Sequence, residues 1–163
     1  MVKVDRMSAL QAHNDDDFPA AATKHLGDAR VLHHSRRHDG ACYLLGYVVE
    51  CSLKAVYLHD RAWDSATRTH NKAKIRAAHK EVSHRPLGHV LSALLAVNVG
   101  PEGARYLPDL PLGPGGAAIL EWKETIRYRS PDPSAAHRAD SWSAWAELVH
   151  DHTVIQMQLD GVL

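Results

Sequence analysis

The stretch that decides the fold is GACYLLGYVVECSLKAVYLHD, which runs from Gly40 to Asp60. It is the most apolar run in the chain, contains no proline, and is long enough for about six turns of α-helix. Glu50 and Lys54 nevertheless stand one helical turn apart in its middle. A helix that only packs on a core does not need charges there. What this charged pair does is therefore the main question that the sequence raises.

On a helical wheel this segment has two different faces. The core face carries Ala41, Leu45, Val48, Val49, Ser52 and Val56. The opposite face carries Tyr43, Tyr47, Glu50, Cys51, Lys54 and Leu58. Because a helix that is apolar nearly all round is buried nearly all round, we expect the second face to be covered by a late helix of the same chain or by another subunit. The charged pair would then hold register at that interface or line a cleft there. If it is exposed instead, it contributes only about 0.3–0.5 kcal/mol.

The composition describes one folded domain without an overall charge bias. The chain has 163 residues, of which 45% are hydrophobic and 23% charged, and a formal net charge of zero. Global charge therefore gives no reason to expect nucleic-acid or membrane binding, although a local patch is compatible with it. We expect no membrane-spanning segment and no secretory signal. Cys42 and Cys51 would lie about 13 Å apart along one helix, so we predict reduced thiols and a cytoplasmic protein. The thirteen histidines contain no HExxH motif, and we predict neither a metal site nor a cofactor.

The remaining sequence predicts an all-α protein of four or five helices in a single domain, residues 18–163. Strand signals are nearly absent, and the turn-forming residues separate helical stretches. The expected segments are a disordered tail over 1–17, a helix over 19–35, a mobile basic connection over 62–85 that is helical around 71–82, a short buried helix over 86–97, a Gly/Pro loop over 98–116, a helix over 116–127, and a final helix from Ser134 to Gly161.

Nine positions of the central stretch follow the pattern A-x-Y-L-x-G-Y-x-x-E-x-x-L-K-A, from Ala41 to Ala55. This pattern resembles the second long helix of HEPN-domain proteins, and the stretches GHVLSALL (88–95) and RYR (127–129) resemble later parts of that family. The resemblance covers about residues 20–160. It implies an up-and-down helical bundle, commonly a homodimer, with a polar cleft near the subunit interface. It also implies association with RNA or nucleotides, since many relatives are metal-independent ribonucleases or toxins paired with a small nucleotidyltransferase partner.

The catalytic signature of that family is not present at its expected place. It is an Arg followed by a His after four to six residues, near the last helix. Here nine residues separate Arg127 from His137, and seven separate Arg129 from His137. One formal match, Arg6 with His13, lies in the N-terminal tail, where chance accounts for it. The catalytic candidates are therefore Arg127, Arg129, His137 and His89, none of them at the expected spacing.

The residues expected to line the cleft are Tyr43, Tyr47, Glu50, Lys54, Arg127 and Tyr128. An arginine beside a tyrosine suits a phosphate contact with a stacked base. The simpler alternative is that the RYR cations cap a helix end. Two functions are compatible with the sequence. The first is an RNA- or nucleotide-associated protein of the toxin–antitoxin or defence type that acts at a homodimer cleft, either as a metal-independent ribonuclease or by binding alone. The second is a non-catalytic dimeric module for protein–protein interaction. No triad, phosphate-binding loop or metal motif supports unrelated small-molecule chemistry.

Overall fold

The computed structural model of the chain describes residues 8–12, 16–83, 91–107 and 118–163. The helices are α1 (Phe18–His34), α2 (His38–Ala62), α3 (Lys72–Ser83), α4 (Leu91–Leu95), α5 (Pro101–Ala104), the 3-10 helix η1 (Glu124–Tyr128), α7 (Ala135–His150), the π-helical turn η2 (Asp151–Ile155) and α8 (Gln156–Leu159). The strands β1 (Trp63–Asp64) and β2 (Thr69–His70) form one antiparallel pair.

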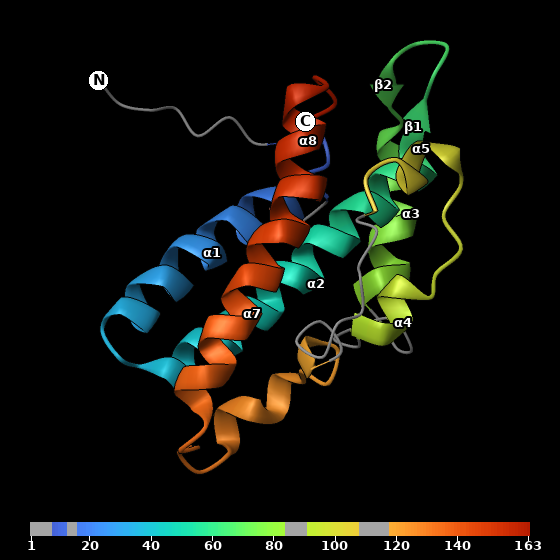
Figure 1. The fold of residues 1–163 in the computed structure, drawn as a ribbon. Coiled ribbons are helices and arrows are strands. Elements are labelled where there is room, and N and C mark those ends of the chain that lie inside the picture. Colours follow the sequence, from blue (N-terminus) through green and yellow to red (C-terminus); the bar gives the residue numbers. More distant parts are fainter. Residues whose placement is uncertain (1–7, 13–15, 84–90, 108–117) are drawn as a thin grey trace.

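Helix α2 is the centre of a helical bundle. Helix α1 packs along it in the opposite direction, and α7 packs against both of them (Figure 1). The shorter helices α3, α4 and α5 also contact α2. The predicted all-α class is confirmed, and the predicted long helices at 19–35, 40–61 and 134–161 correspond to α1, α2 and the run from α7 to α8.

The burial of α2 follows the wheel closely. The residues predicted for the core face are all buried: Ala41, Leu45, Val48, Val49, Ser52 and Val56. On the opposite face Glu50, Cys51, Lys54 and Leu58 are buried, whereas Tyr43 and Tyr47 are half-buried. By length and composition alone α2 is also long enough to cross a membrane, which the sequence analysis did not anticipate. However, 83% of its most apolar window is buried in the fold, as in the core helix of a globular domain.

Part of the segment predicted as a disordered tail, residues 1–17, packs on the bundle. Among its described residues, 8–12 and 16–17, Leu10 is fully buried in the core. Asp17 makes this possible. Its carboxylate accepts a hydrogen bond from the backbone N–H of Ala20, which caps α1, and two more from the backbone and hydroxyl of Ser8. The cap of α1 thus also fastens residues 8–12 to the bundle.

The basic connection at 62–85 contains a hairpin that the sequence did not predict. Strands β1 and β2 pair Trp63 with His70, and the predicted helix near 71–82 follows as α3. The hairpin lacks the glycine that usually signals such a turn. Instead, the carboxylate of Asp64 accepts hydrogen bonds from Ala66 and Thr67, and Arg68 adopts a left-handed conformation with φ 55°.

The predicted helix over 116–127 is confirmed only in part within the described residues. Ala118 and Ile119 are helical and residues 120–121 form a turn, but Lys123 is extended and the chain then continues as the 3-10 helix η1. Ile119 and Trp122 are both buried, and their spacing of three imitates a helical stripe. The helix does not continue there because the indole of Trp122 turns toward α2, where it packs at Gly46 and donates to the carbonyl of Tyr43. The final helix ends at Gly161 as predicted, and the φ of 70° at this glycine is typical of a helix C-terminus. At the other end, the Ser134 side chain does not cap α7, because its hydroxyl donates to Asp132.

Candidate functional site

The charged pair on α2 lies inside the monomer. The Lys54 Nζ atom is 2.6 Å from Oε1 of Glu50, and the two side chains are only 5% and 3% exposed. Helix α1 of the same chain provides the cover, with Phe18 placing its ring centroid 5.2 Å from the Lys54 ammonium. The prediction that a late helix or another subunit covers this face left out α1, which supplies this contact. The late element η2 packs on the same face at Cys51, through Val154. Glu50 and Lys54 belong to the interior packing of α1 on α2 and do not line an open cleft.

Tyr47 and Tyr43 precede the charged pair on α2 by about one and two turns. Both contact later parts of the chain, Trp122 and, for Tyr43, Arg127. The ring of Tyr47 lies edge-on to that of Tyr43 and to the indole of Trp122, with centroid distances of 5.1 and 4.8 Å. The indole N–H of Trp122 donates to the backbone carbonyl of Tyr43 over 3.2 Å. Burial, together with the hydrogen bond from Tyr43, raises the pKa of the Tyr47 hydroxyl. This cluster ties the turn before η1 to α2.

Arg127, on η1, lies against two tyrosines. Its guanidinium donates a hydrogen bond of 3.1 Å to the Tyr43 hydroxyl, and it lies 4.7 Å from the ring centroid of Tyr128 and 6.0 Å from that of Tyr43. The hydrogen bond to Tyr43 raises the pKa of Arg127, which stays charged. Tyr128 is 74% exposed. An exposed aromatic face thus stands beside a cation that is already held in place.

Two neighbouring cavities extend this arrangement toward α7. The larger has a volume of about 510 Å³ and the smaller about 230 Å³. Arg129 and Arg138 line both of them. We call Tyr43, Arg127, Tyr128, Arg129 and Arg138 the basic–aromatic surface.

The cavities beside the basic–aromatic surface carry both signs of charge. Lys123 adds a cation to the larger cavity, and Glu121 adds a carboxylate. Asp39 and Asp132 line the smaller cavity, and the carboxylate of Asp132 is paired with Arg138 at 2.6 Å. Hydrogen bonds from the hydroxyl and backbone of Ser134, with Arg138 beside them, lower the pKa of Asp132 to about 2. Arg127 and Arg129 are therefore the cations of this surface that are not used in the Arg138–Asp132 pair.

The catalytic candidates do not assemble into a cleavage site in the described part of the chain. Arg127 and Arg129 lie on the basic–aromatic surface, but His137 is exposed on α7 and is not among the residues that line the two cavities. His89 lies outside the described residues. Acid–base cleavage of RNA needs a proton acceptor within hydrogen-bond reach of the reacting hydroxyl. Phosphate contact and base stacking are the chemistry that the described side chains supply.

The two cysteines are interior thiols. Both are free and buried, as expected for reduced side chains. Burial raises the pKa of Cys42 to about 11 and that of Cys51 to about 12. Because the thiolate is the reactive form, neither is a nucleophile at neutral pH. Among the described residues, no group of three His, Cys, Asp or Glu side chains could hold a metal ion.

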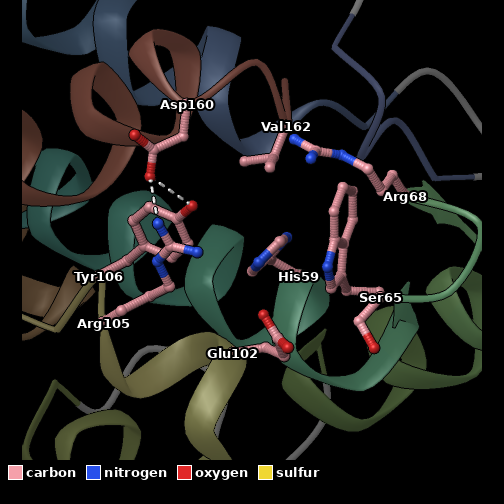
Figure 2. Close-up of a pocket in the computed structure, with 9 residues that line it drawn as sticks. His59, Ser65, Arg68, Glu102, Arg105, Tyr106, Asp160 and Val162 are labelled. Carbon is pink, nitrogen blue, oxygen red and sulfur yellow. Dashed lines mark hydrogen bonds and ion pairs between the residues drawn. The ribbon is translucent and has the colours of Figure 1, made fainter.

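A third cavity, which the sequence did not reveal, lies at the opposite end of α2. Its volume is about 430 Å³, and it opens between the β1–β2 hairpin, α5 and the C-terminal residues (Figure 2). The lining residues are His59, Trp63, Ser65, Arg68, Glu102, Arg105, Tyr106, Asp160 and Val162. We call it the hairpin cavity. The only hint in the sequence is the high number of His, Trp and Arg residues between 59 and 70. Because the residues from 62 onward are predicted as a mobile connection, this hint did not lead to a predicted site.

Comparison of the chain with protein-family models, with curated proteins and with solved structures gives no match in any of the three. The HEPN resemblance of α2 is therefore a prediction carried by its motif residues.

Proposed function

We propose that this chain is an RNA-binding helical-bundle protein of the HEPN-like kind, and that it holds single-stranded RNA on the basic–aromatic surface without cleaving it. The observation that carries the proposal is the position of Arg127 between Tyr43 and the exposed ring of Tyr128. A guanidinium held in this way can donate to a phosphate, and the free face of Tyr128 can stack on a base.

Arg129 and Arg138 extend the surface beyond Arg127, in the direction that we expect a bound RNA backbone to follow. They line cavities next to η1, so successive phosphates can meet successive arginines. Single-stranded RNA suits this arrangement better than a duplex, because a splayed base can reach an aromatic ring and a paired base cannot. The absence of a histidine among the described lining residues supports binding without cleavage.

The homodimer and the nucleotidyltransferase-type partner implied by the resemblance stay predictions. The alternative of a purely structural dimer module receives less support. The missing Arg-to-His spacing still favours it, but the charged pair, which was expected at a dimer interface, is covered by α1 of its own chain. The large apolar side chains that are exposed in the described residues are Val31, Tyr128 and Leu159, which lie on three different elements.

The test is the binding of a short, unstructured, fluorescently labelled RNA, measured by anisotropy at several salt concentrations. Arg127→Ala and Arg129→Ala should each weaken binding about tenfold and flatten the slope of log K against log salt by about 0.7. Tyr128→Ala should weaken binding without changing that slope, since it removes stacking and no charge. The matched control is Arg76→Ala, which removes one exposed cation from α3.

Equal affinity of the wild type and all three surface variants would contradict the proposal, as would an equal loss in Arg76→Ala. The same samples, analysed on a denaturing gel, test the absence of cleavage. RNA that the wild type degrades and Arg127→Ala leaves intact would show that the protein is a nuclease.

A further inference from the structure

Two arginines line the hairpin cavity, and they differ in the contacts that their guanidinium groups make. Arg105 is held in place, with its guanidinium 2.9 Å from Oδ2 of Asp160 and 5.0 Å from the ring centroid of Tyr106. The Tyr106 hydroxyl donates to the same oxygen over 2.8 Å. Arg68, in contrast, has no ion-pair partner among the described residues. Figure 2 draws the two arginines on opposite sides of the cavity.

Arg68 occupies a backbone position that favours glycine. Its φ of 55° lies in the left-handed region, which costs an ordinary residue about 1 kcal/mol. Strained residues of this kind gather at ligand sites, where the side chain serves a purpose that outweighs the strain. The left-handed turn carries the Arg68 side chain back over the cavity (Figure 2). A glycine would fit the hairpin better but would leave this wall without a cation.

His59 provides a polar group inside the cavity. It is 1% exposed, and its Nδ1 atom lies 2.9 Å from Nε2 of His70. Its own Nε2 atom has no hydrogen-bond partner among the described residues. Burial lowers the pKa of both rings to about 4, so both are neutral at physiological pH. A neutral imidazole whose other nitrogen is engaged can offer one hydrogen bond to a ligand.

The other lining residues suit a planar ring with hydroxyl groups. The indole of Trp63 packs against His59 and His70, at centroid distances of 5.1 and 4.9 Å, and is partly exposed to the cavity. Glu102 supplies a carboxylate at the rim, the group that commonly accepts hydrogen bonds from ribose. A volume of about 430 Å³ is within the range of small-molecule sites.

We propose that the hairpin cavity binds a mononucleotide, with the phosphate between Arg68 and Arg105, the base against Trp63, and the ribose hydroxyls at Glu102. This site goes beyond the RNA surface and is separate from it. Tyr43 and His59 stand sixteen positions apart on α2, which corresponds to about 24 Å along the helix axis. One protein would thus bind RNA at one end of α2 and a small nucleotide at the other.

The test is titration calorimetry of the full chain with the four ribonucleoside monophosphates, with adenosine, and with inorganic phosphate. We expect at least one monophosphate to bind with a Kd below about 1 mM, and adenosine and phosphate each to bind at least about tenfold more weakly. Arg68→Gly should weaken that binding by about tenfold or more, because it removes a phosphate contact. Its melting temperature should be unchanged or higher, since glycine relieves the strained φ.

The control is Arg76→Ala, which removes a cation from the surface of the neighbouring helix α3 and should bind the nucleotide as the wild type does. The proposal is overturned if no monophosphate binds, if Arg68→Gly binds as tightly as the wild type, or if inorganic phosphate alone binds as tightly as the nucleotide.

Discussion

The indole of Trp122 fills the space that any side chain at position 46 would need. A Cβ atom built on Gly46 would lie 2.1 Å from the indole nitrogen, closer than any real contact. The bare backbone of α2 at this point lets the ring lie flat against the helix and donate to the carbonyl of Tyr43. Since Trp122 stands two residues before η1, this contact also positions Arg127.

Gly46→Ala should therefore displace Trp122 and destabilise the fold by about 1–3 kcal/mol, as over-packing of a core does. It should also weaken RNA binding, because η1 loses its anchor on α2. Urea unfolding measures the first effect. Gly27→Ala is the matched control: a Cβ there meets nothing within 4 Å, so the change should stabilise α1 by about 0.5–1 kcal/mol. Equal stabilities of the two variants would contradict this role for Trp122.

The ion pair between Glu50 and Lys54 should behave as interior architecture. Lys54→Met keeps most of the side-chain volume but leaves the Glu50 carboxylate buried without its ammonium, and it should cost about 3–5 kcal/mol in urea unfolding. The double variant Glu50→Leu/Lys54→Met removes both charges and should recover most of that loss. A single variant as stable as the wild type would show that water reaches the pair.

Acid should weaken the fold through the buried histidines His59 and His70. Their pKa values of about 4 in the folded state lie below the ordinary value near 6.5, so the unfolded chain binds more protons between these limits. Stability is therefore complete above about pH 6.5 and falls as the pH drops toward 4. Melting temperatures between pH 4 and 7 measure this slope.

The control for the pH effect is His70→Gln, whose amide can hydrogen-bond to His59 but does not titrate. It should show a shallower loss of melting temperature over the same range. A wild-type melting temperature that does not change between pH 7 and 4.5 would contradict the low pKa values of this pair.

The sequence predicted what rests on helical periodicity and missed what rests on single long-range contacts. The core face of α2 and the final helix follow from their repeating apolar positions. Tyr43 and Arg127, which the family resemblance implies for one cleft, are joined by a hydrogen bond, but their place in a functional site stays a prediction. The cover over Lys54 could not be assigned, because periodicity shows that a face is buried and not which helix buries it. Phe18, which provides it, is the first residue of α1 and lies one position before the helix that the sequence predicts.

The expected helix over 116–127 is interrupted because Trp122 packs against Gly46. These two residues are far apart in the chain, so the local sequence does not predict their contact. The hairpin depends on Asp64 and on a left-handed arginine, and residue propensities argue against the latter. The hairpin cavity could not be predicted because its walls come from four separate segments: the end of α2, the β1–β2 hairpin, residues in and after α5, and the C-terminal residues. No single stretch of sequence carries its signature.

The most direct measurement is the site of photocrosslinking between the wild-type protein and a short RNA that contains 4-thiouridine, located by mass spectrometry of the digested complex. Binding at the basic–aromatic surface predicts crosslinks on Tyr128 and on peptides from η1 and the start of α7, and their loss in Arg127→Ala. Crosslinks concentrated on the β1–β2 hairpin and α3, or unchanged in Arg127→Ala, would show that RNA binds elsewhere on the chain.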